Sequence, residues 1–164
     1  MADWLGLLEW FEGSALGNAV RGAGVWAYAF INLAHILGIA TLFGAVLVLD
    51  LRLLGWRREV NLATLATLTV PVAATGFILA LVSGTCLLAT NATDYAGNPF
   101  LLIKFAAIGF ALINVLVAAR LPAWRSRAQR EAGGRERVQL ATLGAVSLTS
   151  WLTAIVAGRM IGYW

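Results

Sequence analysis

Four long apolar segments decide what this chain can fold into. They cover about residues 25–50, 64–90, 99–120 and 138–160, and each reaches the roughly 20 mainly apolar residues that cross the hydrocarbon core of a bilayer. Because a backbone in lipid must satisfy its own hydrogen bonds, each segment is predicted to be a helix. The sequence therefore predicts an all-α integral membrane protein, a four-helix bundle that forms a single transmembrane domain over residues 1–164.

Two of these segments carry a proline with a structural meaning. Asn98-Pro99 opens the third segment as an N-cap followed by a proline in the first turn, which is a favoured way to begin a helix. Pro71 lies inside the second segment and removes one backbone donor. It is expected either to kink that helix or to mark its start.

The basic residues predict the orientation. Nine of the twelve lie in the two connections after the first and third segments, and basic loops stay on the cytoplasmic side. The connection over 121–137 is thus predicted to be a basic cytoplasmic loop, with both termini on the periplasmic side of a bacterial inner membrane. The net charge of +4 reflects this arrangement, and no nucleic-acid partner is expected.

Residues 3–20 are predicted to form one amphipathic helix at the outer interface. At 100° per residue, apolar side chains gather on one side and Glu9 lies opposite. An acidic polar face argues against binding to anionic lipid, so a lid or collar packed on the outer rim of the bundle is favoured. The apolar side chains in question are Trp4, Leu7, Leu8 and Phe11.

Polar side chains within the spans are the candidates for function, because they are costly in lipid. On the first span Tyr28, Asn32 and His35 fall within about 60° of one another and predict one polar stripe. Asp50 and Arg52 at its inner end are interpreted as an interfacial ion pair or as flanking charges.

The later spans add two cations at the depth of His35. These are Lys104 on the third span and Arg159 on the fourth; either could instead extend its charge to the headgroups. The fourth span also carries Thr142, Thr149, Thr153 and Met160 on one stripe. Helix packing, rather than pore lining, is the favoured interpretation of the threonines and of small residues such as Ala34 with Gly38 and Ala80 with Gly84.

His35, the only histidine, leaves several alternatives open. A neutral imidazole could hydrogen-bond Asn32, Tyr28 or a neighbouring helix, relay protons, or bind a metal. Zinc or copper needs several ligands, whereas haem iron needs one strong ligand plus a second ligand or an open position. Haem propionates favour nearby cations, which Lys104 and Arg159 could supply.

The stretches "AHILGIATLFGAVLVLDLRLLG", "NPFLLIKFAAIGFALINVLVAAR" and "AGRMIGYW" resemble a family of small bacterial inner-membrane proteins known only as a domain of unknown function. That resemblance covers nearly the whole chain and implies a fold and a location without an activity.

A more distant similarity, to the copper-resistance D-type membrane proteins and the four-helix bacterial protoporphyrinogen oxidases, implies chemistry. His35-Ile36-Leu37-Gly38, Arg52-Leu53 and Lys104-Phe105 are similar to the motifs of the latter. The resemblance implies that His35 binds the iron of haem b and that Lys104 is a second ligand or a propionate partner. A further histidine often found about three turns after that lysine is absent, and Asn114 or Val115 stands near its place.

Three functions are therefore expected as alternatives. The first is a b-type haem-binding redox protein with haem between the first and third spans near the outer face, with Tyr28, Asn32 and Met160 close by. The second is a structural or accessory subunit whose polar residues only set helix packing. A channel or carrier is less favoured, because four helices without a mid-membrane carboxylate give little for an ion pathway. The expected partners are the lipid bilayer, a second copy of the chain or a membrane redox partner; whether the chain is an enzyme stays open.

Overall fold

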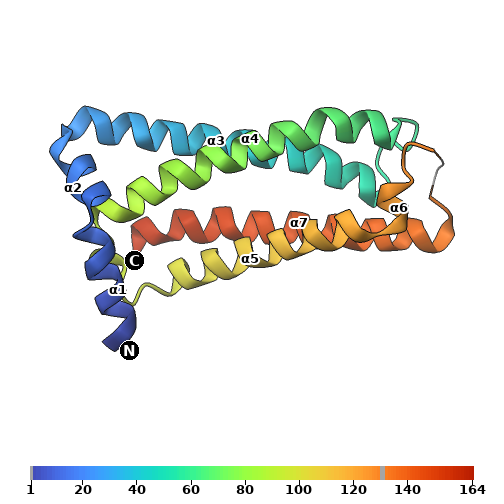
Figure 1. The fold of residues 1–164 in the computed structure, drawn as a ribbon. Helices are drawn as coiled ribbons and strands as arrows, with labels where there is room; N and C mark the ends of the chain where they lie inside the picture. Colours follow the sequence, from blue (N-terminus) through green and yellow to red (C-terminus); the bar gives the residue numbers. More distant parts are fainter. Residues whose placement is uncertain (1, 130–131) are drawn as a thin grey trace. The chain divides into compact units, whose positions relative to one another are not determined.

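The part of the chain that the computed structural model describes is mainly helical; it comprises residues 2–129 and 132–164, with side chains from residue 5 onward. No strand occurs in these residues. The helices, labelled in Figure 1, are α1 (Ala2–Glu12), α2 (Ala15–Gly22), α3 (Gly24–Leu54), α4 (Leu62–Thr90), α5 (Pro99–Arg120), α6 (Pro122–Arg125) and α7 (Gly134–Met160), with short 3-10 helices η1 (Thr93–Tyr95) and η2 (Ile161–Tyr163).

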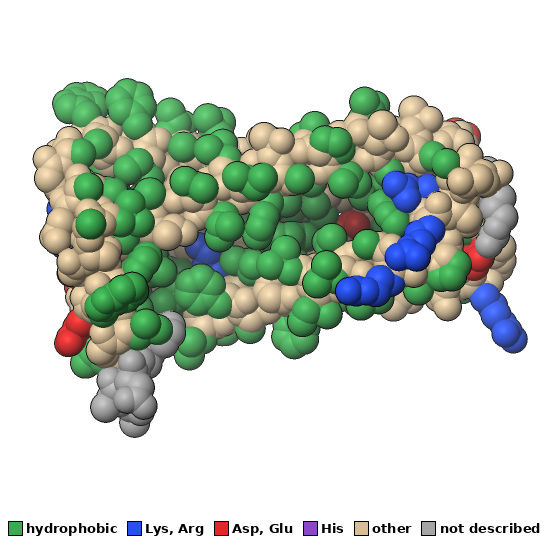
Figure 2. Space-filling model, viewed as in Figure 1, with side chains coloured by type: hydrophobic (Ala, Val, Ile, Leu, Met, Phe, Trp, Pro, Cys, Tyr) green, Lys and Arg blue, Asp and Glu red, His purple; other side chains and the backbone are tan. Residues whose placement is uncertain are grey.

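Four of these helices are long and apolar enough to cross a membrane. The candidate spans are α3, α4, α5 and the segment Gly134–Tyr163, which joins α7 to η2. At about 1.5 Å per residue, even the 22 residues of α5 cover the roughly 30 Å of a hydrocarbon core. Apolar side chains lie along the face of the long helices that Figure 2 shows. The prediction of a multi-pass, all-α membrane protein is confirmed.

One proline lies at the start of a helix and the other lies inside a helix. α5 begins at Pro99 as predicted. Pro71 lies inside α4 and does not mark its start. α4 begins earlier because the side chain of Asn61 accepts the backbone N–H of Thr64 at 3.0 Å, which caps the first turn.

The amino-terminal segment forms two helices, so the prediction of one helix over 3–20 was wrong. The break lies at Gly13-Ser14, where the Ser14 hydroxyl accepts the Gly17 N–H at 3.3 Å and starts α2. A serine N-cap offers the backbone this alternative to continuing α1. On α1 Leu8 is buried and Leu7 is exposed; the side chain of Trp4 lies outside the described residues.

The chain divides into two compact units. The first comprises the residues up to Leu42 together with Ala74–Pro99, and the second comprises Phe43–Ala73 together with Phe100–Trp164. Each unit contains one part of α3 and one part of α4, and each is described by itself below.

In the first unit, α1 and α2 pack on the end of α4, as the lid interpretation expects (Figure 1). The Arg21 guanidinium donates to the Thr90 carbonyl at 2.9 Å. The Glu12 carboxylate accepts both the backbone N–H and the hydroxyl of Thr93 at 2.7 Å. These bonds tie the two short helices to the end of α4 and to η1.

The same unit brings α3 and α4 into backbone contact. A Cβ atom on Gly38 would lie 2.6 Å from the Ala80 nitrogen, and one on Gly76 would lie 2.5 Å from the Leu42 nitrogen. Small residues permit such close approach, which replaces the hydrophobic effect as the source of helix association in lipid. This contact sets the distance across which His35 reaches α4.

Candidate functional site

His35 of α3 is hydrogen-bonded to α4. Its Nδ1 atom lies 2.9 Å from the Ala80 carbonyl oxygen and 3.2 Å from the Ser83 hydroxyl. A carbonyl oxygen can only accept a hydrogen bond. Nδ1 therefore carries the ring proton and donates a hydrogen bond to the Ala80 carbonyl oxygen. In the neutral imidazole the lone pair then belongs to Nε2, the nitrogen that ligates metals in this tautomer.

Gly84 makes room for the imidazole. A Cβ atom at this position would lie 2.7 Å from Cε1 of His35 and 3.2 Å from Nδ1. The ring therefore rests against the backbone of α4, one turn beyond Ala80. Ala80 and Gly84, predicted only as packing residues, also fix where this imidazole lies.

The predicted polar stripe of α3 is only partly buried. The side chains of Tyr28 and Asn32 are both exposed, and the hydrogen bonds of His35 given above go to the other helix. Sequence reasoning missed Ser83. A helical wheel of α4 would have placed Ser83 on the face of Ala80 and Gly84, because residues three and four apart are neighbours.

Lys104 and Arg159 belong to the second unit, where both lie near the end of α7. The Lys104 stem packs against Gly158, whose added Cβ would meet the lysine Cε and Nζ atoms at 3.6 Å. Arg159 places its guanidinium 4.7 Å from the ring centroid of Tyr163 and donates to the tyrosine hydroxyl. Met160 is 37% exposed. α7 thus lies against Lys104, while Arg159 turns to the end of its own helix.

The interpretation of Asp50 as an interfacial ion pair or flanking charge was wrong. Its side chain is only 3% exposed and is hydrogen-bonded by Ser147 of α7. Its backbone oxygen would lie 3.1 Å from a Cβ on Gly144, so the close approach of α3 to α7 encloses the carboxyl group. Oδ2 makes no hydrogen bond with the described residues, and Arg52 donates to the Val60 carbonyl instead.

The threonine stripe of α7 lies on its exposed side. Thr142, Thr149 and Thr153 are exposed, whereas the buried side of the helix carries Gly144 and Trp151. The Thr142 hydroxyl donates to the Val138 carbonyl one turn earlier, at 3.0 Å. A threonine can satisfy its hydroxyl within its own helix in this way, so the prediction that this stripe packs the helices was wrong.

Few groups in the structure could hold a metal ion without a prosthetic group. No cluster of three or more histidine, cysteine, aspartate or glutamate side chains occurs within residues 2–129 and 132–164. Cys86 is a free, partly buried thiol. Within the described residues, the candidate site therefore contains one oriented imidazole.

Comparisons with models of protein families, with curated proteins and with solved structures each found no match.

Proposed function

We propose that this membrane protein binds b-type haem, with His35 as a ligand of the iron. The observation that carries the proposal is the 2.9 Å hydrogen bond from Nδ1 to the Ala80 carbonyl. Histidines that ligate metals usually donate their other ring nitrogen to a carbonyl or carboxylate, which fixes the tautomer and raises ligand basicity. His35 has this arrangement.

Several residues of the chain would contribute to haem binding in different ways. Ala80 and Ser83 hold the proton at Nδ1 and orient the ring, and Gly84 leaves the space in which it lies. Lys104 and Arg159 are the cations that the proposal assigns to the propionates, or Lys104 to the iron as a second ligand. Bound haem would supply one-electron chemistry. The resemblance to haem-binding protoporphyrinogen oxidases supports the same assignment, with a membrane redox partner.

A structural role is the second candidate, and one observation favours it. The contact between the His35 ring and the Gly84 backbone continues the close packing of α3 and α4 at Gly38 and Gly76. In that role the imidazole would only hydrogen-bond the two helices together. Substitution of His35 would then lower stability and change nothing else.

The absorption spectrum of the purified protein separates these candidates. We expect a Soret band and, after reduction with dithionite, sharp α and β bands, all lost in His35→Ala. Thr41→Ala is the matched control, because Thr41 is an exposed polar residue of the same helix with no proposed role in haem binding, and its spectrum should equal that of the unmodified chain. A protein that stays colourless after haem is added would leave only the structural role.

The orientation proposed for this protein in the membrane rests on the positions of its basic residues. Arg52, Arg58, Arg127 and Arg137 all lie in the second unit around one pocket, at the ends of spanning helices. Because basic segments stay in the cytoplasm, we assign this end to the cytoplasmic side of a bacterial inner membrane and both termini to the periplasmic side.

A further inference from the structure

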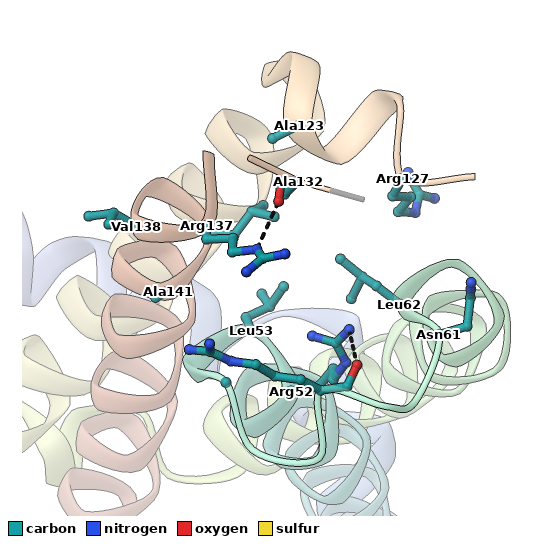
Figure 3. A pocket seen from close by; sticks show the side chains of 13 residues that line it. Arg52, Leu53, Asn61, Leu62, Ala123, Arg127, Ala132, Arg137, Val138 and Ala141 are labelled. Atoms are coloured by element: carbon teal, nitrogen blue, oxygen red, sulfur yellow. Dashed lines mark hydrogen bonds between the residues drawn. The ribbon is translucent and has the colours of Figure 1, made fainter. Parts of the chain in front are cut away.

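A pocket of about 330 Å³ lies within the second unit, where α3 ends and α7 begins. Four arginines line it, together with Asn61 and a set of apolar side chains (Figure 3). The arginines are Arg52, Arg58, Arg127 and Arg137, and the apolar residues are Leu53, Leu62, Ala123, Val138, Leu140 and Ala141. Figure 2 shows basic side chains gathered at the end of the second unit that carries α6.

Backbone carbonyls accept hydrogen bonds from Arg52 and Arg137 and hold these two side chains in place. Arg52 donates to the carbonyls of Val60 at 2.7 Å and Arg58 at 2.9 Å, and Arg137 donates to the Ala132 carbonyl at 2.8 Å. The guanidinium of Arg127 lies 4.2 Å from the ring centroid of Trp124. A guanidinium carries five N–H donors, so the two bonds of Arg52 fix its position while leaving it further donors.

The described residues that line the pocket include four arginines and no aspartate or glutamate. Glu59 pairs with Arg57 at 3.4 Å, and the Glu136 carboxylate accepts the Gly133 N–H at 2.9 Å; neither lines the pocket. An anion with several acceptor oxygens is attracted to four guanidinium groups that line one space.

We propose that this pocket binds a phosphate group. Arginine forks match the paired oxygens of phosphate, and the apolar lining suits the glycerol and first methylenes of a phospholipid. The pocket lies at the ends of spanning helices, where lipid headgroups are found, and basic pockets at such ends bind acidic headgroups. Phosphate can also come from solution, so the experiment below separates the two sources. The proposal is independent of haem.

The test compares two double variants with equal loss of charge. Arg58→Gln/Arg137→Gln removes two arginines of the pocket, and Arg57→Gln/Arg120→Gln removes two that do not line it. Each full-length protein is purified in neutral detergent, and bound phosphatidylglycerol and phosphatidylcholine are counted by native mass spectrometry. A thermal-shift titration with inorganic phosphate forms the second arm.

We expect the unmodified protein to retain phosphatidylglycerol in preference to phosphatidylcholine. Affinity should fall about tenfold for each pocket arginine removed and less than about twofold in the matched variant. If inorganic phosphate does not change the melting temperature, the site is assigned to lipid. If phosphate raises the melting temperature of the unmodified protein but not that of the pocket variant, the site is assigned to soluble phosphate. Either result supports a phosphate site.

Two results would overturn the proposal of a phosphate site. Equal losses in both double variants would show diffuse surface charge, and no preference for either phosphate source would leave the pocket without this ligand. If the pocket variant fails to fold by circular dichroism, Arg58→Gln alone decides, because Arg58 is an exposed side chain.

Discussion

His35 shows how one side chain can acquire a role from its neighbours. Alone it is a polar residue in an apolar helix, which is costly. The Ala80 carbonyl orients it and Gly84 gives it space. The sequence identifies His35 because it is the only histidine. Its partners depend on how two helices cross, and the period of one helix does not contain that information.

Glu12 is the residue whose protonation should control the docking of α1. The hydrogen bonds from the Thr93 backbone N–H and hydroxyl, with Arg21 nearby, lower the pKa of Glu12. Because the folded pKa is lowered, the stabilisation is present above the unfolded value of about 4.3 and is lost as pH falls through the folded value.

The amide NMR signal of Thr93 in detergent micelles should therefore titrate with a midpoint below about 4.3. Glu12→Gln should abolish this titration, since the amide side chain carries no ionisable proton in this range. Glu9→Gln, on the same helix at an exposed position, should leave it unchanged. A midpoint at or above the unfolded value would contradict the bond to Thr93.

At the scale of elements, the close contact of α3 and α4 is the feature that positions the site. Gly38, Gly76 and Ala80 bring two backbones together. Sequence reasoning singled out Ala34 with Gly38 and Ala80 with Gly84 as packing pairs, but it did not find Gly76. Any of several small residues on α4 could have met α3, because a helix wheel gives the face and not the partner.

Gly76→Ala should destabilise the protein by about 1–3 kcal/mol, the usual cost of adding an atom to a filled contact. The added Cβ would lie 2.5 Å from the Leu42 nitrogen and 2.8 Å from the Gly38 carbonyl oxygen, so the helices must separate. Unfolding in mixed detergent with added dodecyl sulfate measures the change.

Gly44→Ala is the control, because nothing lies within 4 Å of its added Cβ. It should be neutral or stabilising by up to about 1 kcal/mol, since alanine favours helices over glycine. Equal destabilisation by both substitutions would show that the cost is not a matter of contact between α3 and α4.

At the scale of the whole molecule, hydropathy and charge predict most of what can be predicted. The four spans follow from length and composition, because lipid permits few other structures. The break between α1 and α2 at Ser14 and the burial of Asp50 cannot be predicted from length and composition. The first depends on a single capping bond, and the second on a glycine of another helix, Gly144.

The orientation can be tested with single cysteines in a Cys86→Ala chain. We expect a membrane-impermeant maleimide added to intact spheroplasts to label Asn91→Cys, between α4 and η1. Gln129→Cys, in the arginine-rich connection after α6, should react only after the membrane is opened, because basic loops stay in the cytoplasm. Both side chains are exposed. The opposite pattern would reverse the assignment.

The central claim is that the His35 imidazole itself ligates iron, and chemical rescue tests it most directly. His35→Gly removes the ligand and leaves a space of its size, so the reduced α and β bands of the haem complex should disappear. Added imidazole should restore them in this variant and leave the Thr41→Ala protein unaffected. Two results would contradict the claim. The first is an unmodified chain that shows no haem spectrum, with His35→Gly only lowering stability; the second is α and β bands that persist in His35→Gly without imidazole.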